Sequence, residues 1–194
     1  MEPKTQVRSE TGRYKEDEAA LVEAARRDSE AFAALYRRYL NPLYRYMLCR
    51  LNNVHDAEDL TAQVFTEALE GRVTGRYREG SNFANGCFAA WLFTIARRRL
   101  VDFYRMRPVE PLGDPPSPEP GLLVAVEKGE DLQRLARLLA RLDEDRRELL
   151  RLRFSAGLSF TEIGLLEGRS EAAVKMALYR ALDTLRELWE DENG

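Results

Sequence analysis

The chain has 194 residues, of which 44% are hydrophobic and 32% are charged, and its formal net charge is -3. This length fits one domain or two small ones, and the apolar content is enough for a buried core in each. No apolar run approaches the roughly 20 residues that a bilayer span needs, and the polar N-terminal segment lacks the apolar stretch of a secretory signal. We therefore expect a cytoplasmic protein without a membrane span.

The side chains that could carry metal or covalent chemistry are few. Cys49, Cys87 and His55 are the only cysteines and histidine, whereas a structural zinc site normally takes four such ligands. No metal and no other cofactor is assigned, and two half-buried thiols in a reducing compartment are the simpler interpretation. The sequence also lacks a phosphate-binding glycine-lysine loop and a Ser/His/Asp set, so we expect neither an enzyme nor a small-molecule substrate.

Helical periodicity dominates the first half of the chain, since apolar residues recur every three or four positions and strand-like alternation is absent. In chain order, the second expected helix starts after Asp28 or Ser29. The third has Pro42 in its first turn, where proline is tolerated. Asn52-Asn53 should end that third helix. The other helices expected in this half cover about 17–27, 56–69 and 88–105, with a glycine-containing loop at 71–86.

The composition changes sharply at residues 108–121, PVEPLGDPPSPEPG, which hold six prolines and two glycines. Such a segment is typical of an extended, flexible linker. The sequence therefore predicts an all-α protein with two small helical domains joined by a Pro-rich linker. The expected boundaries are a disordered tail at 1–16, a first domain at 17–107, the linker at 108–127 and a second domain at 128–190.

The second domain begins with a leucine-rich helix, and Asp143 should cap the next one. Ser159 followed by Glu162 is a capping box, which predicts a short helix at 160–166. Gly168 then makes a turn, and Ser170 caps a last helix that runs to about residue 189. A short helix, a tight turn and a capped longer helix form the helix-turn-helix plan. An ordinary helical hairpin packed on a partner helix is the alternative.

Charge is distributed unevenly along the chain. Residues 91–107 carry five arginines and one acid, whereas residues 108–131 carry six acids and one lysine. This asymmetry indicates a basic contact face beside an acidic spacer. Arginine suits phosphate and base-edge contacts because its planar fork donates two hydrogen bonds. A GC-rich genome explains the excess of arginine over lysine equally well.

Residues 131–188 resemble region 4 of the extracytoplasmic-function (ECF) sigma factors of bacterial RNA polymerase. The resemblance rests on L-x-x-R-F-x-x-G-L-S-x-x-E-I from Leu150 and S-x-x-x-V-K from Ser170. The first domain resembles region 2, through D-A-E-D-L from Asp56 and W-L-x-x-I-A-R from Trp91. The resemblance implies a sigma subunit that directs core polymerase to promoters and helps to melt them. It also implies an anti-sigma partner that binds between the two domains.

Asp56, Asp59 and Gln63 lie at i, i+3 and i+7 and so share one face of a helix. By resemblance, this face binds the clamp coiled coil of the polymerase's largest subunit. The family usually has Gln-Glu or Gln-Asp where this chain has Ala62-Gln63, so one carboxylate is lost. The alternative is a solvated acidic helix start that is favourable to the helix dipole.

The resemblance also implies contacts to promoter DNA, both as duplex and as melted non-template strand. At the -10 element, basic side chains would bind phosphates, and the preceding loop would capture an unstacked base. Phe83 could instead anchor that loop in the core. The loop is longer than in the family, and Arg98 stands where Asn is common. The -10 candidates are Asn82, Phe83, Asn85, Arg97, Arg98 and Arg105.

At the -35 element, the N-terminal half of the last helix would enter the major groove. The family often has arginine where this chain has Ala177. Two other functions remain open: a helix-turn-helix regulator that acts without core polymerase, and a helical adaptor that titrates an anti-sigma factor. The -35 candidates are Arg169, Ser170, Glu171, Lys175, Met176 and Arg180.

Overall fold

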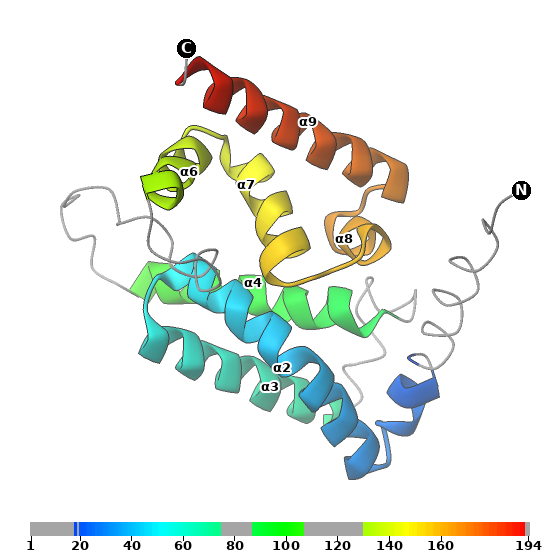
Figure 1. Cartoon of the computed structure of the whole chain (residues 1–194). Coiled ribbons are helices and arrows are strands. Elements are labelled where there is room, and N and C mark those ends of the chain that lie inside the picture. The colour runs from blue at the N-terminus through cyan, green and yellow to red at the C-terminus, as the bar shows by residue number, and fades with distance from the viewer. Residues whose placement is uncertain (1–17, 19, 75–86, 107–129, 193–194) are drawn as a thin grey trace, which may run out of the picture.

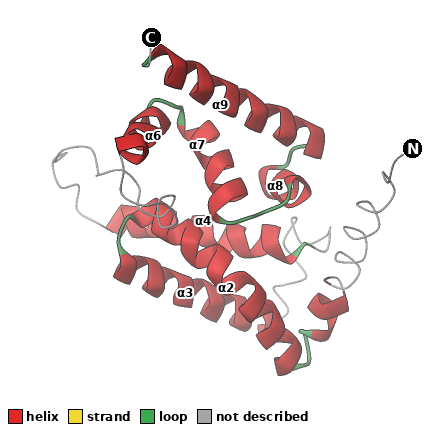
Figure 2. Cartoon of the chain, viewed as in Figure 1, coloured by secondary structure: helices red, strands yellow, loops and turns green. Residues whose placement is uncertain are grey.

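The computed structural model describes residue 18 and residues 20–74, 87–106 and 130–192. Every regular element in these ranges is a helix, which confirms the all-α class (Figure 2). None of the described helices is long and apolar enough to span a membrane. The expected tail at 1–16 and linker at 108–127 lie outside the described residues.

The helices form two groups (Figure 1). We call the first the N-terminal bundle, and it consists of α2 (Ser29–Leu51), α3 (Val54–Thr74) and α4 (Phe88–Met106). Residues 20–24 precede it as a short helical segment. We call the second the C-terminal bundle, and it consists of α6 (Glu130–Ala140), α7 (Glu144–Leu150), a π-helical turn η2 (Arg151–Ser155), α8 (Phe160–Glu167) and α9 (Glu171–Asp191).

Helix α2 is continuous through Pro42, so the expected boundary between two helices at this proline is wrong. Proline inside a helix removes one backbone hydrogen bond and costs about 3 kcal/mol. Each fully buried large apolar side chain contributes about 1.5–3 kcal/mol, and Leu35, Leu43 and Tyr46 are fully buried on the inner face of α2. Their stripe continues past the proline and outweighs its cost.

The ends of these helices follow local capping rules. Asn52 ends α2 as expected, with φ 51° and its N–H donating to the Leu48 carbonyl at 2.9 Å. The Asn53 side chain then accepts from the Asp56 N–H at 3.1 Å and starts α3. Helix α3 is longer than the expected 56–69 at both ends, whereas α4 agrees with the expectation to within one residue.

In the C-terminal bundle, Asp143 caps α7 as expected, by accepting from the Arg146 N–H at 2.8 Å. The chain then widens into η2, where the Ala156 N–H donates to the Arg151 carbonyl at 3.0 Å. Gly157 follows with φ 69°, a conformation that glycine adopts without strain. This path turns the Arg151 side chain inward, where only 5% of it is exposed.

The two bundles pack directly against each other. Helix α2 contacts η2, and α4 contacts α8, where the two bundles lie side by side (Figure 1). Buried residues of both bundles form one continuous core. The thiol of Cys49 and the hydroxyl of Ser155 lie 3.3 Å apart within this interface. Cys49 and Cys87 are both buried free thiols. The sequence predicts two helical domains but not this packing.

Candidate nucleic-acid interface

Helices α8 and α9 form the predicted helix-turn-helix. Ser159 accepts from the Glu162 N–H at 3.2 Å while the Glu162 carboxylate accepts from the Ser159 N–H at 2.6 Å, so the predicted capping box is present. The Ser170 hydroxyl accepts from the Ala173 N–H at 3.2 Å and starts α9. Both ends of the turn are therefore fixed by short-range hydrogen bonds.

The turn itself depends on glycine at two positions. Gly168 has φ 64°, in the left-handed region. Gly164 is needed for a different reason, because a Cβ atom there would lie 2.7 Å from the backbone oxygen of Arg169. The Arg169 N–H donates to the Gly164 carbonyl at 2.8 Å. Close backbone contact across the turn thus sets the angle between the two helices.

The inner face of α9 is buried through Val174, Leu178 and Ala181, while all six side chains predicted for the -35 element are exposed. Glu171 is held in place, since it accepts a hydrogen bond from the Thr161 hydroxyl at 2.6 Å. Ala177, at the position where the family often has arginine, is half-buried against the core. The exposed residues are Arg169, Ser170, Glu171, Lys175, Met176 and Arg180.

Two neighbours add apolar and aromatic surface to this exposed face. Met176 and Tyr179 are 55% and 51% exposed, and the Lys175 ammonium lies 5.9 Å from the centre of the Tyr179 ring. Apolar side chains on a recognition helix can contact thymine methyl groups, and a lysine can contact phosphate or guanine. The face therefore carries both kinds of group that duplex DNA recognition uses.

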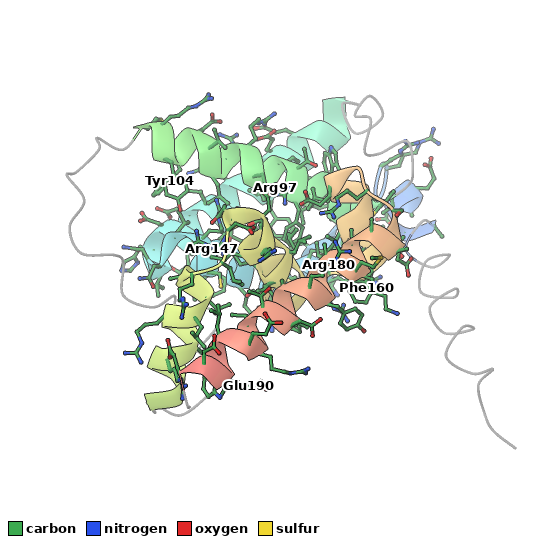
Figure 3. The ribbon with its side chains drawn as sticks, turned by 90° about the horizontal axis from the view of Figure 1, so that it is seen from above. Arg97, Tyr104, Arg147, Phe160, Arg180 and Glu190 are labelled. Atoms are coloured by element: carbon green, nitrogen blue, oxygen red, sulfur yellow. The ribbon has the colours of Figure 1, made fainter. Side chains whose placement is uncertain are left out.

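The arginines predicted for the -10 element lie on α4 in different environments. Arg98 and Arg105 are exposed, and Arg98 forms an ion pair with Glu67 of α3. Arg97 instead lies on the side of α4 that faces the C-terminal bundle (Figure 3), where it pairs with Glu148 and Glu167. The candidates Asn82, Phe83 and Asn85 lie outside the described residues.

The acidic face predicted for polymerase lies on the outer side of α3. Asp59 and Gln63 are exposed and Asp56 is half-buried. The opposite side of α3 is buried through Ala57, Leu60 and Val64. One face of α3 is therefore packed in the core, and Asp59 and Gln63 on the opposite face are accessible to a partner.

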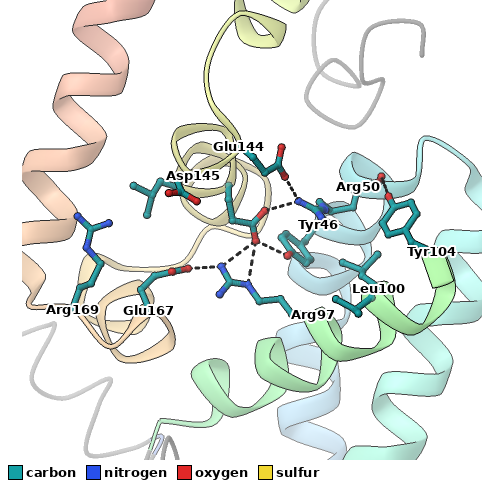
Figure 4. Close-up of a pocket in the computed structure, with 12 residues that line it drawn as sticks. Tyr46, Arg50, Arg97, Leu100, Tyr104, Glu144, Asp145, Glu167 and Arg169 are labelled. Atoms are coloured by element: carbon teal, nitrogen blue, oxygen red, sulfur yellow. Dashed lines mark hydrogen bonds and ion pairs between the residues drawn. The ribbon is translucent and has the colours of Figure 1, made fainter. Parts of the chain in front are cut away.

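Between the bundles, the Glu148 carboxylate of α7 accepts hydrogen bonds from α2 and α4. Figure 4 labels the donors Tyr46, Arg50 and Arg97. Tyr46 donates to Glu148 at 2.6 Å, Arg50 at 3.1 Å, and Arg97 through two nitrogens at 3.2 and 3.1 Å. Glu144 pairs with Arg50 and accepts from the guanidinium of Arg151 at 2.8 Å. The contact between the bundles is thus strongly polar at its centre.

The protonation of this cluster follows from burial and charge. Burial first, and then the Glu148 carboxylate, raise the pKa of the Tyr46 hydroxyl far above its usual value, so it stays a donor. Burial lowers the pKa of Arg97, but Tyr46, Glu148 and Glu167 together raise it overall. Arg97 therefore remains a charged guanidinium, although it is only partly accessible to solvent.

A cleft of about 500 Å³ opens beside this cluster, between α2 and α4 on one side and α7 and α8 on the other. Its walls also carry Leu100, Val101, Tyr104 and Asp145. Sequence reasoning missed the cluster, since it gave neither Tyr46 nor Glu148 a role. One signal was available, because Arg151 stands within the apolar run from Leu149 to Leu152 and a buried arginine needs an anionic partner.

Comparison with known proteins gives the family. The family description "Sigma-70 region 2" matches residues 35–107, and "Sigma-70, region 4" matches residues 132–185. The chain is 34% identical over 190 residues to the ECF RNA polymerase sigma factor BldN of Streptomyces coelicolor, covering 91% of this chain and 68% of BldN. It belongs to the ECF family of RNA polymerase sigma factors. Another relative of this sigma factor is ShbA of Streptomyces griseus, 33% identical over 78% of this chain and 84% of ShbA.

Solved structures support the fold of this sigma factor. CnrH in complex with the cytosolic domain of CnrY matches with a TM-score of 0.61 and 24% identity, over 90% of this chain and 97% of that one. RpoE of Bartonella quintana, solved with the anti-sigma factor NepR, matches with a TM-score of 0.54 and 24% identity, over 82% and 96%. The all-helical arrangement of the described residues is therefore that of sigma factors.

Proposed function

We propose that this sigma factor binds core RNA polymerase through the outer face of α3 and promoter DNA through α4 and the N-terminal half of α9. The observation that carries the proposal is the helix-turn-helix, whose six candidate DNA contacts are exposed together while the inner face of α9 is buried. Core polymerase catalyses RNA synthesis, and the sigma factor positions the polymerase at the promoter. Because promoter DNA and polymerase share the bacterial cytoplasm, the protein acts there.

The polymerase contact is assigned to Asp56, Asp59 and Gln63. Asp59 and Gln63 are exposed, on a helix whose other side is buried in the N-terminal bundle. An acidic face complements a basic partner surface and speeds its association. With Gln63 in place of the family's glutamate or aspartate, the two aspartates carry all of the negative charge on this face.

The DNA contacts fall into two sets. On α4, Arg98 and Arg105 point away from the core and suit backbone phosphates. Asn82, Phe83 and Asn85 are proposed to capture an unstacked base of the non-template strand at the -10 element. On α9, Lys175 and Met176 are proposed to contact base edges at the -35 element. The remaining contacts proposed at the -35 element are Arg169, Ser170, Glu171 and Arg180.

An anti-sigma factor is the proposed regulatory partner. RpoE of Bartonella quintana is solved in complex with the anti-sigma factor NepR, and we extend that kind of partnership to this chain. The cleft between the bundles, which has both charged and apolar walls, is the surface that such a partner would enter.

Two adjacent acidic residues allow a sharp test of the polymerase face. Asp59→Ala removes a carboxylate from the proposed face, whereas Glu58→Ala removes an exposed carboxylate from the other flank of α3. Fluorescence anisotropy with purified core polymerase should show binding weakened at least about tenfold for Asp59→Ala and little changed for Glu58→Ala. Equal effects of the two variants would contradict the assigned face.

Run-off transcription extends this test to function. The double variant Asp56→Ala/Asp59→Ala should lose promoter-specific transcripts in proportion to its loss of core binding. Normal transcription by the double variant would count against the assigned face. DNA binding without any promoter-specific initiation by the unmodified protein would favour a regulator that acts without polymerase.

A further inference from the structure

Three donors from the N-terminal bundle converge on a single carboxylate. The Tyr46 hydroxyl, the Arg50 guanidinium and the Arg97 guanidinium all donate to Glu148, at 2.6–3.2 Å. We call these three side chains the donor cradle. They come from α2 and α4 (Figure 4), whereas the Glu148 carboxylate comes from α7 of the other bundle.

Contacts within the N-terminal bundle hold part of the cradle in place. The Tyr46 ring is fully buried and lies edge-on to Phe93, with the ring centres 5.2 Å apart. The backbone oxygen of Arg50 accepts from the Tyr104 hydroxyl of α4 at 2.6 Å. The N-terminal bundle therefore positions the Tyr46 ring and the backbone at Arg50, whereas the carboxylates of the C-terminal bundle hold the two guanidinium groups.

The chemistry of the cradle suits a phosphate. Two guanidinium groups and a hydroxyl present several N–H and O–H donors to one oxyanion, and such charge-assisted bonds are the strong ones. Glu144 and Glu167 add carboxylates beside Glu148, and these three acids pair with Arg50 and Arg97. Arg151 of η2 also pairs with Glu144 and Glu148, at 2.8 and 3.5 Å. Arg97 lies on α4, the helix that also carries the proposed -10 contacts Arg98 and Arg105.

The proposed function requires the cradle to be vacated. The -10 and -35 elements are, by their positions, about 25 base pairs apart, which is about 85 Å along a duplex. Helix α8 of the helix-turn-helix touches α4 in this structure, so the two DNA contacts cannot both form while the bundles are packed. Once they separate, two charged guanidinium groups and a hydroxyl lose the Glu148 carboxylate as their acceptor and become available to another oxyanion.

We propose that Tyr46, Arg50 and Arg97 form a binding site for a backbone phosphate of promoter DNA, and that Glu148 occupies this site while the bundles are packed together. The inference rests on the proposed function, because the ligand is the DNA bound by the N-terminal bundle. It adds Tyr46 and Arg50 to the DNA contacts, and it makes Glu148 a competitor of DNA within the same chain.

The test uses the full chain and a fluorescein-labelled 30-base-pair duplex without promoter sequence, with binding followed by anisotropy at several salt concentrations. Glu148→Gln keeps the shape of the side chain and removes its charge. The matched control is Asp145→Asn, which makes the same charge change on α7. Asp145 is exposed, lines the same cleft and has no hydrogen bond to the cradle in the part of the chain that the structure describes.

Glu148→Gln should bind the duplex about five- to tenfold more tightly than the unmodified protein, with a salt slope steeper by about one, as expected for one added phosphate contact. Asp145→Asn should change affinity less than twofold. Adding Arg50→Gln to Glu148→Gln should abolish the gain. Equal affinity of Glu148→Gln and Asp145→Asn would overturn the inference, and so would a gain that survives Arg50→Gln.

Folding and function are checked separately. If Glu148→Gln unfolds at the assay temperature, Glu148→Asp replaces it, since the shorter side chain keeps its charge but withdraws from the cradle; no gain in that variant would equally overturn the inference. Transcription with core polymerase separates the two claims. An unmodified protein that fails to direct initiation contradicts the proposed function, whereas one that initiates while Glu148→Gln gains no affinity contradicts only the cradle.

Discussion

Tyr46 donates a hydrogen bond to Glu148 at 2.6 Å although 102 residues separate the two along the chain. The bond joins the middle of α2 to α7, and so joins the bundle proposed to bind polymerase to the bundle that carries the helix-turn-helix. It is the shortest contact that Glu148 makes with the donor cradle. The packed arrangement of the two bundles therefore depends on polar as well as apolar contacts.

Tyr46→Phe should loosen the packed arrangement without unfolding the N-terminal bundle. The ring still packs on Phe93, and only a hydrogen bond to a charged group is lost, worth about 1.5–3 kcal/mol. Small-angle X-ray scattering should show a larger radius of gyration. The control is Tyr39→Phe, which loses a hydroxyl bond to Glu18 before α2 and should leave the radius unchanged. Equal radii for the two variants would contradict the role given to Tyr46.

Gly164→Ala should destabilise the helix-turn-helix by about 1–3 kcal/mol, because the new methyl group would overlap backbone rather than a movable side chain. Urea unfolding measures the loss. Gly168→Asn is the comparison, since Gly168 has open space around it and asparagine tolerates its positive φ. A smaller effect at Gly164 than at Gly168 would show that the turn relaxes more readily than its geometry implies.

Lys175→Ala should weaken binding of a -35 duplex about tenfold and reduce the salt slope if the contact is to phosphate. Arg186→Ala provides the control, because Arg186 is exposed near the far end of α9, where it pairs with Asp183. Anisotropy titrations at two salt concentrations distinguish the variants. An equal loss for both would mean that overall charge, rather than the N-terminal half of α9, controls DNA binding.

Glu18→Gln should stabilise the protein at neutral pH. Burial raises the pKa of the Glu18 carboxyl above 4.5, against the opposing effects of Tyr39 and Arg38. Protonated Glu18 contributes to the free energy of unfolding, and this contribution is fully present below about pH 4.5. It is lost as the pH rises through the raised pKa of the folded state. Denaturant unfolding from pH 4 to pH 8 should show the variant's advantage growing with pH. Glu23→Gln, at an exposed site, is the control and should not change stability with pH in this way. A stability advantage of Glu18→Gln that is constant from pH 4 to pH 8 would contradict the raised pKa of Glu18.

Cys87 should react slowly with iodoacetamide at neutral pH, because burial raises the pKa of its thiol to about 11 and the thiolate is the reactive form. The labelling rate, followed by mass spectrometry, should rise only toward pH 11 or on unfolding. Labelling of folded protein at pH 8 as fast as free glutathione would contradict this environment.

The elements that the sequence predicted well are those that depend on residues adjacent in the sequence. Ser159 with Glu162, Ser170 and Asp143 each form the predicted cap, because a cap needs only a side chain and a backbone N–H two or three positions away. The continuity of α2 through Pro42 escaped prediction, since it depends on how much surface that helix buries against its neighbours. The polymerase and DNA sites remain assignments by exposure and family resemblance.

The interface between the bundles could not be predicted for a similar reason. The sequence predicts a DNA contact for Arg97 from its place in a basic helix. The residues near Arg97 in the sequence do not indicate that Glu148 and Glu167 lie against it. Ion pairs between residues 51 and 70 positions apart follow from the packing of two bundles, which local patterns do not encode. The same arginine can serve both partners, and this gives the donor cradle its proposed function.

The most direct measurement of the central claim is the mapping of transcript 5′ ends. Purified core polymerase is supplied with this sigma factor and a library of genomic DNA fragments, and the start sites are sequenced. The account predicts a discrete set of starts that require the protein, that share two upstream motifs, and that disappear with Asp56→Ala/Asp59→Ala. The same starts from core polymerase alone, or no starts that depend on the protein, would contradict it.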